Sequence, residues 1–128
     1  MSIDDVDGVM QICRDEAWPS FAEDGDKTWR ALTAPGVTTI VALEDGAVIG
    51  FAQMQSDGVV QAHLSTIAVR RDRRSSGIGK RLVQEALARA GGLRIDLIST
   101  ESSDGFYESF EHRRFPGFRI YPETPAPR

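Results

Sequence analysis

The chain has 128 residues, a length that suits one domain and leaves no room for a second, so we expect a single domain over residues 1–128. Its formal net charge is −4, which gives no overall attraction to nucleic acid or to an anionic membrane surface. A single cysteine, Cys13, excludes an intrachain disulfide, and the lack of a signal-like N-terminus or of a run of about 20 apolar residues leads us to expect a cytoplasmic protein without a membrane segment.

The apolar pattern predicts two helices first and three strands after them. Residues 6–17 carry apolar side chains at spacings of three and four, and residues 26–32 follow as a second short helix. Turn signals at Asp45-Gly46 and Asp57-Gly58 then separate strands expected at residues 37–43, 47–55 and 59–69. Beyond them we expect a helix at 77–90, a strand at 93–98, a short helix at 104–110, a strand at 117–121 and a mobile tail at 122–128.

This order of elements predicts an α/β (α+β) fold. Tight turns join the first three strands, which should therefore run antiparallel. The helix at 77–90 connects two further strands, at 59–69 and 93–98, and should make that pair parallel. The expected architecture is a mixed, mostly antiparallel central sheet with flanking helices.

Residues 69–82 have the composition of an anion-binding segment. Residues 70–81 contain six basic side chains against Asp72 alone, although residues 1–60 carry a net charge of −8. The helix begins near Gly77, where unpaired backbone N–H groups and the positive end of the helix dipole favour negative charge. Gly77 and Gly79 allow a phosphate to approach the backbone closely, and Arg74 can add charge-assisted hydrogen bonds. The alternative is a solvated basic turn before an ordinary helix.

The spacing in this segment differs from that of the common nucleotide-binding motifs. The Walker motif requires an earlier glycine that is missing here, and the dinucleotide-binding fingerprint requires glycine where Leu82 stands. The run Arg74-Ser75-Ser76-Gly77-Ile78-Gly79 does fit the pattern Arg/Gln-x-x-Gly-x-Gly/Ala. A second run, Phe106-Tyr107-Glu108-Ser109-Phe110, follows the strand expected at 93–98.

Both runs, with the order of elements over residues 6–121, resemble the GNAT (GCN-related N-acetyltransferase) superfamily. Two departures stand out. The first strand of that family is short or missing here, because only Met1 to Ile3 precede the first helix. The Phe-Tyr helix of the family commonly continues into Gly-Phe, where this chain has Glu111-His112.

The resemblance implies acetyl-CoA (coenzyme A) as the cofactor and assigns its contacts. Ile67 and Val69 would hydrogen-bond the pantetheine arm through their backbone, and a splay between the strands at 59–69 and 93–98 would admit the thioester. The pyrophosphate would bind at the α-helix start, with Arg74 alongside. The expected cofactor-binding residues are Ile67, Ala68, Val69, Arg74, Ser75, Ser76, Gly77, Ile78, Gly79 and Lys80.

Tyr107 and His63 are the candidate catalytic residues. The resemblance places Tyr107 near the thioester sulfur, where its hydroxyl could protonate the leaving thiolate, although the ring could instead only pack against its surroundings. His63 stands where related enzymes often carry a carboxylate base, and its imidazole could accept a proton at neutral pH. Ordered water or backbone carbonyls are the alternative proton path. A backbone N–H of Ile67 or Val69 would stabilise the oxyanion.

Strict alternation along the strand at 59–69 puts His63 and Ser65 on one face, and Leu64 and Ala68 on the other. Cys13 lies on the apolar stripe of the first helix and is predicted to be a core residue rather than a nucleophile. The two histidines are 49 residues apart, so we expect no metal site.

An aromatic and acidic set in and around the loop between the first two helices has two interpretations: a rim for a cationic amine acceptor, or solvated acids with core-facing aromatics. The set is Trp18, Phe21, Glu23, Asp24 and Trp29.

The resemblance, together with Tyr107 and His63, implies an N-acetyltransferase that would move an acetyl group from acetyl-CoA to a primary amine by direct attack in a ternary complex. The acceptor would be a small molecule or a peptide, and the protein a monomer or a homodimer, in which the edge strand at 117–121 could pair between subunits. A non-catalytic acyl-CoA-binding sensor is the alternative, because it would share the phosphate-binding segment. Nucleic-acid binding is disfavoured, because no aromatic residue interleaves with the basic run.

Overall fold

A computed structural model of the protein describes residues 1–123, which fall into two compact units. The first unit spans residues 1–96 and holds the sheet, and the second begins at Leu97. Most of the tail predicted at 122–128 lies outside the described residues.

Short helices open the first unit. A 3₁₀ helix, η1 (Ile3–Asp5), leads into α1 (Val6–Asp15), and α2 (Pro19–Ala22) and α3 (Gly25–Leu32) follow. Acidic side chains cap two of these starts: Asp5 accepts a hydrogen bond from the Ser2 N–H at 2.8 Å, and Asp24 accepts one from the Lys27 N–H at 3.1 Å. Among the described residues, none before α1 forms a strand, so the expected short or missing first strand is confirmed.

Four strands form one sheet in the order β1-β2-β3-β4. They are β1 (Val37–Glu44), β2 (Ala47–Ser56), β3 (Gln61–Val69) and β4 (Arg94–Asp96). The first three run antiparallel and β4 pairs parallel to β3, which confirms the predicted mixed sheet. The sheet is mostly antiparallel because its hairpin turns leave room for no crossover, whereas α4 (Ile78–Ala90) spans the return from β3 to β4.

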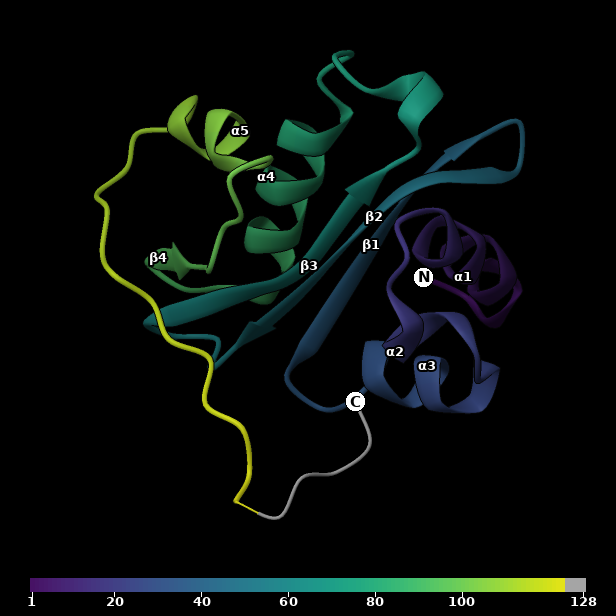
Figure 1. Cartoon of the computed structure of the whole chain (residues 1–128), viewed down its shortest axis with the longest axis horizontal. Coiled ribbons are helices and arrows are strands. Elements are labelled where there is room, and N and C mark those ends of the chain that lie inside the picture. Colours follow the sequence, from purple (N-terminus) through teal and green to yellow (C-terminus); the bar gives the residue numbers. More distant parts are fainter. Residues whose placement is uncertain (124–128) are drawn as a thin grey trace. The chain divides into compact units, whose positions relative to one another are not determined.

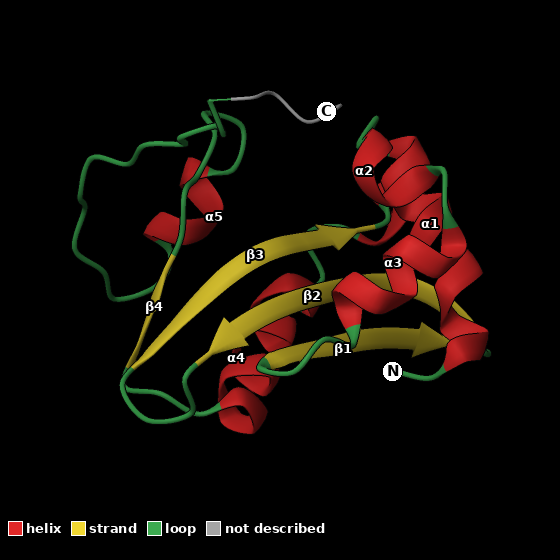
Figure 2. Cartoon of the chain, turned by 90° about the horizontal axis from the view of Figure 1, so that it is seen from below, coloured by secondary structure: helices red, strands yellow, loops and turns green. Residues whose placement is uncertain are grey.

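Helices cover both faces of the sheet: α1 and α3 lie on one side and α4 on the other (Figure 1, Figure 2). On the first side, apolar residues of α1 and α3 pack against Phe51 of β2 and Ala68 of β3. Gly8 lets α1 approach β2 closely, since a Cβ at this position would come within 2.8 Å of the Val48 side chain. On the second side, the buried stripe of α4 consists of Leu82, Val83 and Ala86.

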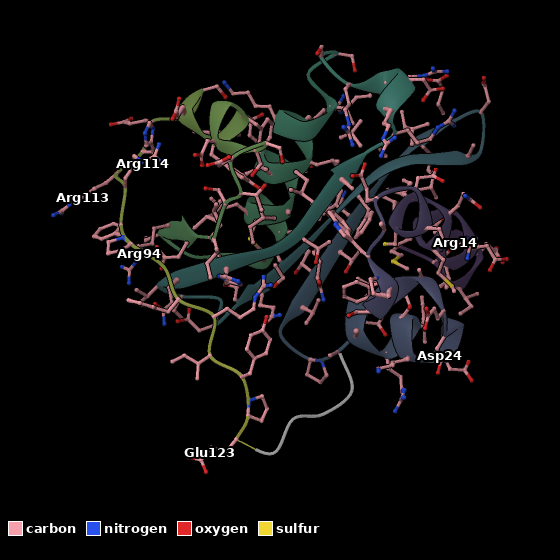
Figure 3. The ribbon with its side chains drawn as sticks, in the orientation of Figure 1. Arg14, Asp24, Arg94, Arg113, Arg114 and Glu123 are labelled. Carbon is pink, nitrogen blue, oxygen red and sulfur yellow. The ribbon has the colours of Figure 1, made fainter. Side chains whose placement is uncertain are left out.

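The second unit contains α5 (Asp104–Glu108), the one helix of its described part. Phe106 contacts both Tyr107 and Phe110 edge to face, with ring centroids 5.1 Å and 5.4 Å apart. Arg114 binds back to this helix through Glu108 at 2.8 Å and Asp104 at 3.5 Å (Figure 3).

The prediction of a strand at 117–121 is wrong. These residues have no regular structure, and Phe118 and Ile120 are 83% and 90% exposed. Aromatic and β-branched residues favour a strand only where a neighbouring strand gives them a surface to pack against, and the described residues pair this segment with none.

Candidate functional site

The sheet opens on the β4 side of β3. Only Gln61, Ala62 and His63 pair with β4, so β3 has no strand partner on that side from residue 64 to residue 69 among the described residues. This part of β3 therefore offers an edge to which an extended ligand can add as a further strand, although Arg74 already donates to the Val69 carbonyl there. This geometry agrees with the splay between these strands that the family resemblance implies.

A β-bulge decides which backbone groups face the open edge. Met54 of β2 pairs with Leu64 and Gln53 pairs with Thr66, so Ser65 is an extra residue with no partner on β2. The Arg70 N–H donates to the Ile49 carbonyl at 2.8 Å, which turns the backbone of residue 70 toward β2. The backbone N–H and C=O groups of adjacent strand residues point to opposite sides of the strand. Those of Ile67 and Val69 therefore point toward the open edge.

The same bulge corrects one sequence-based placement. Alternation put Ala68 on the face opposite His63, but Ala68 pairs with Phe51 and lies in the core beneath α1. His63 pairs with Gln55, on the same face of β2 as Phe51. The extra residue between them shifts the phase of the alternation, so His63 and Ala68 share a face.

The turn from β3 into α4 has the backbone of an anion site. A 3₁₀ turn, η2 (Arg71–Arg73), is followed by Ser75 with φ 65° and by Gly77 with φ 85°, the left-handed N-cap of α4. The first intrahelical bond runs from the Arg81 N–H to the Gly77 carbonyl, at 3.1 Å. The N–H groups of Ile78 and Gly79 precede that bond and point out of the helix end. This end can attract negative charge through both its donors and its dipole.

The arginines around this turn are paired with neighbours of the first unit. Arg73 makes a two-pronged contact with Glu44, at 2.9 Å and 2.6 Å, and this hydrogen bonding holds the pKa of Glu44 below its usual value. Arg70 binds Asp72 at 2.7 Å, and Arg71 donates to the Asp15 carbonyl at 3.1 Å. The charge of the basic run is therefore partly neutralised by its own neighbours.

Arg74 lies across the end of the open edge. Its Nε donates to the Val69 carbonyl at 3.0 Å, and its guanidinium forms an ion pair with Glu16, just beyond α1. The sequence singled out Arg74 but gave no sign of Glu16, which is 58 residues away along the chain. Together with the Arg71 contact to Asp15, this ion pair connects the turn before α4 to the C-terminal end of α1.

His63 is exposed and has polar cross-strand neighbours. It pairs with Gln55 of β2 and with Asp96 of β4. The Gln55 amide donates to the Ser65 hydroxyl at 2.9 Å, so hydrogen-bonding groups lie beside the imidazole on the same face. Gln55 carries no local sequence signal, because only its pairing with His63 brings it to this place.

Tyr107 belongs to the second unit, whereas His63, the open edge and the turn before α4 belong to the first. Burial raises the pKa of the Tyr107 hydroxyl above its usual value of 10.0. The hydroxyl is therefore protonated at neutral pH and can act as a donor.

Two other sequence candidates have structural roles. Cys13 is fully buried in the core, and burial raises its thiol pKa to about 11, which confirms the core assignment. In the aromatic and acidic set, Trp18 and Phe21 pack against the core. Asp24, labelled in Figure 3, caps α3.

Two hollows lie along α1. One, of about 370 Å³, is lined by Asp15, Glu16 and residues 70–72, and the other, of about 430 Å³, extends to the start of β2. His63 lines neither of them, so they stand apart from the proposed proton acceptor.

A sequence model of the acetyltransferase (GNAT) family matches residues 6–111. The chain belongs to this family. The match spans the sheet, the turn before α4 and the helix that carries Tyr107, and it supports an acyl-CoA-dependent N-acetyltransferase.

Solved structures share the fold at low sequence identity. An acetyltransferase of Trypanosoma brucei is 20% identical with a TM-score of 0.74, and 95% of each chain is covered. A ribosomal-protein-alanine N-acetyltransferase of Brucella melitensis is 17% identical with a TM-score of 0.73, covering 95% of this chain and 94% of that one. The structure of AAC(6')-Iy in complex with the bisubstrate analogue CoA-S-monomethyl-acetylneamine is 19% identical with a TM-score of 0.71, covering 92% and 90%.

A comparison with curated proteins finds no match. Within residues 1–123, none of the helices has the length and apolar character needed to cross a membrane.

Proposed function

We propose that the protein transfers an acetyl group from acetyl-CoA to a primary amine by direct attack within a ternary complex. The observation that carries this proposal is the open edge of β3. This edge is followed directly by the turn that leads into α4. An extended amide-bearing arm fits the edge, and a pyrophosphate fits the helix start. The two features follow one another along the chain in the order in which one elongated ligand would meet them.

The residues present fit such a ligand. Backbone groups of Ile67 and Val69 bind the arm, as an added strand would be bound. Backbone N–H groups from Ser76 to Lys80 bind the pyrophosphate, with Ser75 and Gly77 setting the turn. Arg74 adds a charge-assisted hydrogen bond once its guanidinium is released from or shared with Glu16.

The chemistry needs two proton movements. The thioester supplies the acyl group, whose carbonyl carbon bonds to the amine nitrogen as the carbon–sulfur bond breaks. His63 accepts the proton that the amine must lose, directly or through water. Tyr107 donates a proton to the departing sulfur, and a backbone N–H of Ile67 or Val69 stabilises the carbonyl oxygen.

Release of free thiol from acetyl-CoA by the purified chain tests this proposal, with a panel of amines that includes an aminoglycoside and an alanine-terminated peptide. Replacing Tyr107 by Phe, or His63 by Gln, should lower kcat about hundredfold, because general acid and base groups commonly contribute at least that factor. The chain holds two tyrosines and two histidines, so Tyr121→Phe and His112→Gln serve as matched controls and should keep wild-type rates.

Full activity in both Tyr107→Phe and His63→Gln would contradict proton donation by Tyr107 and proton acceptance by His63. An acyl-CoA-binding sensor is the remaining alternative. It would bind coenzyme A and turn over none of the amines, and that result would overturn the proposed reaction.

A further inference from the structure

Three polar residues, two of them buried and the third half-buried, form a row across three strands beneath α3. Thr39 of β1 pairs with Gln53 of β2, which pairs with Thr66 of β3. Thr39 and Gln53 are only 8% and 4% exposed. A buried polar group without a hydrogen-bond partner destabilises the fold, so the partners of these side chains indicate their structural role.

The row binds the C-terminal end of α3. The Thr39 hydroxyl donates to the Leu32 carbonyl at 2.7 Å, and the Gln53 amide donates to the Ala31 carbonyl at 3.3 Å. Carbonyls in the last turn of a helix have no partner within the helix, so both contacts satisfy groups that would otherwise be unpaired.

Gln53 also makes a contact with β3, for which Thr39 has no equivalent. Its carbonyl oxygen accepts a hydrogen bond from the Thr66 hydroxyl at 3.0 Å. Thr66 is the first residue after the extra Ser65, and the register of β2 with β3 shifts between Gln53 and Met54. One carboxamide therefore joins α3 to β3 at the residue where the bulge ends.

We propose that Gln53 is a positioning residue for the cofactor edge. By holding Thr66 against β2, it fixes the point at which β3 resumes regular pairing. That point sets the direction of the backbone groups of Ile67 and Val69. The inference rests on the proposed function in taking this edge as the place where coenzyme A binds.

If Gln53 only filled space in the core, its replacement would lower stability without a specific effect on the edge of β3. The test therefore compares replacements of Gln53 and Thr39, which both bind the C-terminal end of α3. The variants Gln53→Met and Thr66→Val remove the bond between β2 and β3 with little change of shape. Thr66→Ser keeps that hydroxyl. Thr39→Val is the matched control, because it cuts a buried bond from the sheet to α3 but leaves the Gln53–Thr66 bond in place.

Titration calorimetry with coenzyme A measures affinity on the full chain. We expect binding to weaken about tenfold in Gln53→Met and Thr66→Val, the size of effect that follows from leaving a buried polar group unpaired. Thr66→Ser and Thr39→Val should stay within about twofold of wild type, because they keep the contact at the bulge. Without ligand, the amide NMR signals of Ile67 and Val69 should shift in Gln53→Met but not in Thr39→Val.

Equal weakening in Thr39→Val and Gln53→Met would overturn the inference, as would unchanged Ile67 and Val69 signals in Gln53→Met. If Gln53→Met does not fold, the comparison of Thr66→Val with Thr66→Ser decides it. A wild-type chain that binds no coenzyme A would refute the proposed function instead, and the amide signals would still judge the role of Gln53.

Discussion

Arg74 is held by two acceptors of its own chain, the Val69 carbonyl and the Glu16 carboxylate. Both contacts occupy groups that the proposed cofactor needs: the carbonyl lies on the open edge, and the guanidinium lies beside the expected pyrophosphate. Binding of coenzyme A would therefore exchange the Glu16 ion pair for a contact with phosphate. The pair is partly exposed, so the exchange costs little.

We expect Glu16→Gln to tighten coenzyme A binding about two- to fivefold, because a partly exposed ion pair of this kind contributes at most about 1 kcal/mol. Arg74→Gln should weaken binding by a similar factor. Calorimetry measures both, with Glu23→Gln as a control for the loss of one acidic charge. Weaker binding in Glu16→Gln would show instead that Glu16 holds Arg74 in its binding position.

For individual residues of the candidate site, the sequence indicated which ones matter but not which residues they bind. Gly77, Arg74 and His63 could be chosen because their types and spacings carry chemical meaning within a short stretch. Glu16 and Gln53 could not, because each acquires its role only when folding brings it to a residue far away in the chain. Side-chain pairing of this kind leaves no local pattern.

The start of α4 depends on one backbone conformation. Gly77 has φ 85°, and a Cβ there would meet no atom within 4 Å. Its requirement for glycine is therefore conformational rather than steric, since residues with a Cβ adopt this region at a cost.

Gly77→Ala should lower the free energy of unfolding by roughly 1 kcal/mol, the cost of the left-handed conformation for a residue with a side chain. Urea denaturation measures the change. Gly25→Ala is a suitable control in the same unit, because Gly25 begins α3 without a positive φ and its added Cβ would make only an ordinary contact with Met10. A loss as large in Gly25→Ala would mean that conformation at Gly77 is not the cause.

Elements bounded by local signals were predictable, and those defined by pairing were not. Turn residues such as Asp45-Gly46 separate β1 from β2 within one residue of the expected limits. The bulge at Ser65 and the unpaired segment at 117–121 depend on what the neighbouring chain does. Hydrophobicity and β-propensity are properties of one segment, whereas a ladder is a property of two.

Stability of the whole molecule should depend on pH through Cys13. Burial raises its pKa from 9.0 to about 11, so the folded protein keeps a proton that the unfolded chain loses above pH 9. The free energy of unfolding should therefore be unaffected by this group below pH 9 and should fall as pH rises toward 11. The full effect of a shift of two units is roughly 3 kcal/mol.

Urea denaturation of wild type and Cys13→Ala at pH 7, 9 and 10.5 isolates this contribution. The alanine variant should be less stable at pH 7, because it leaves a small cavity, and the gap should narrow as pH rises. A gap that stays constant would contradict the assignment.

The extra residue of β3 interrupts the ladder without displacing it. Ser65 has no backbone partner on β2, although its hydroxyl accepts a hydrogen bond from Gln55. Every other pair of that ladder would stay in register in a strand without this residue. The ladder therefore tolerates a change of length at this one position, whereas a change elsewhere in β3 would turn the following side chains to the opposite face.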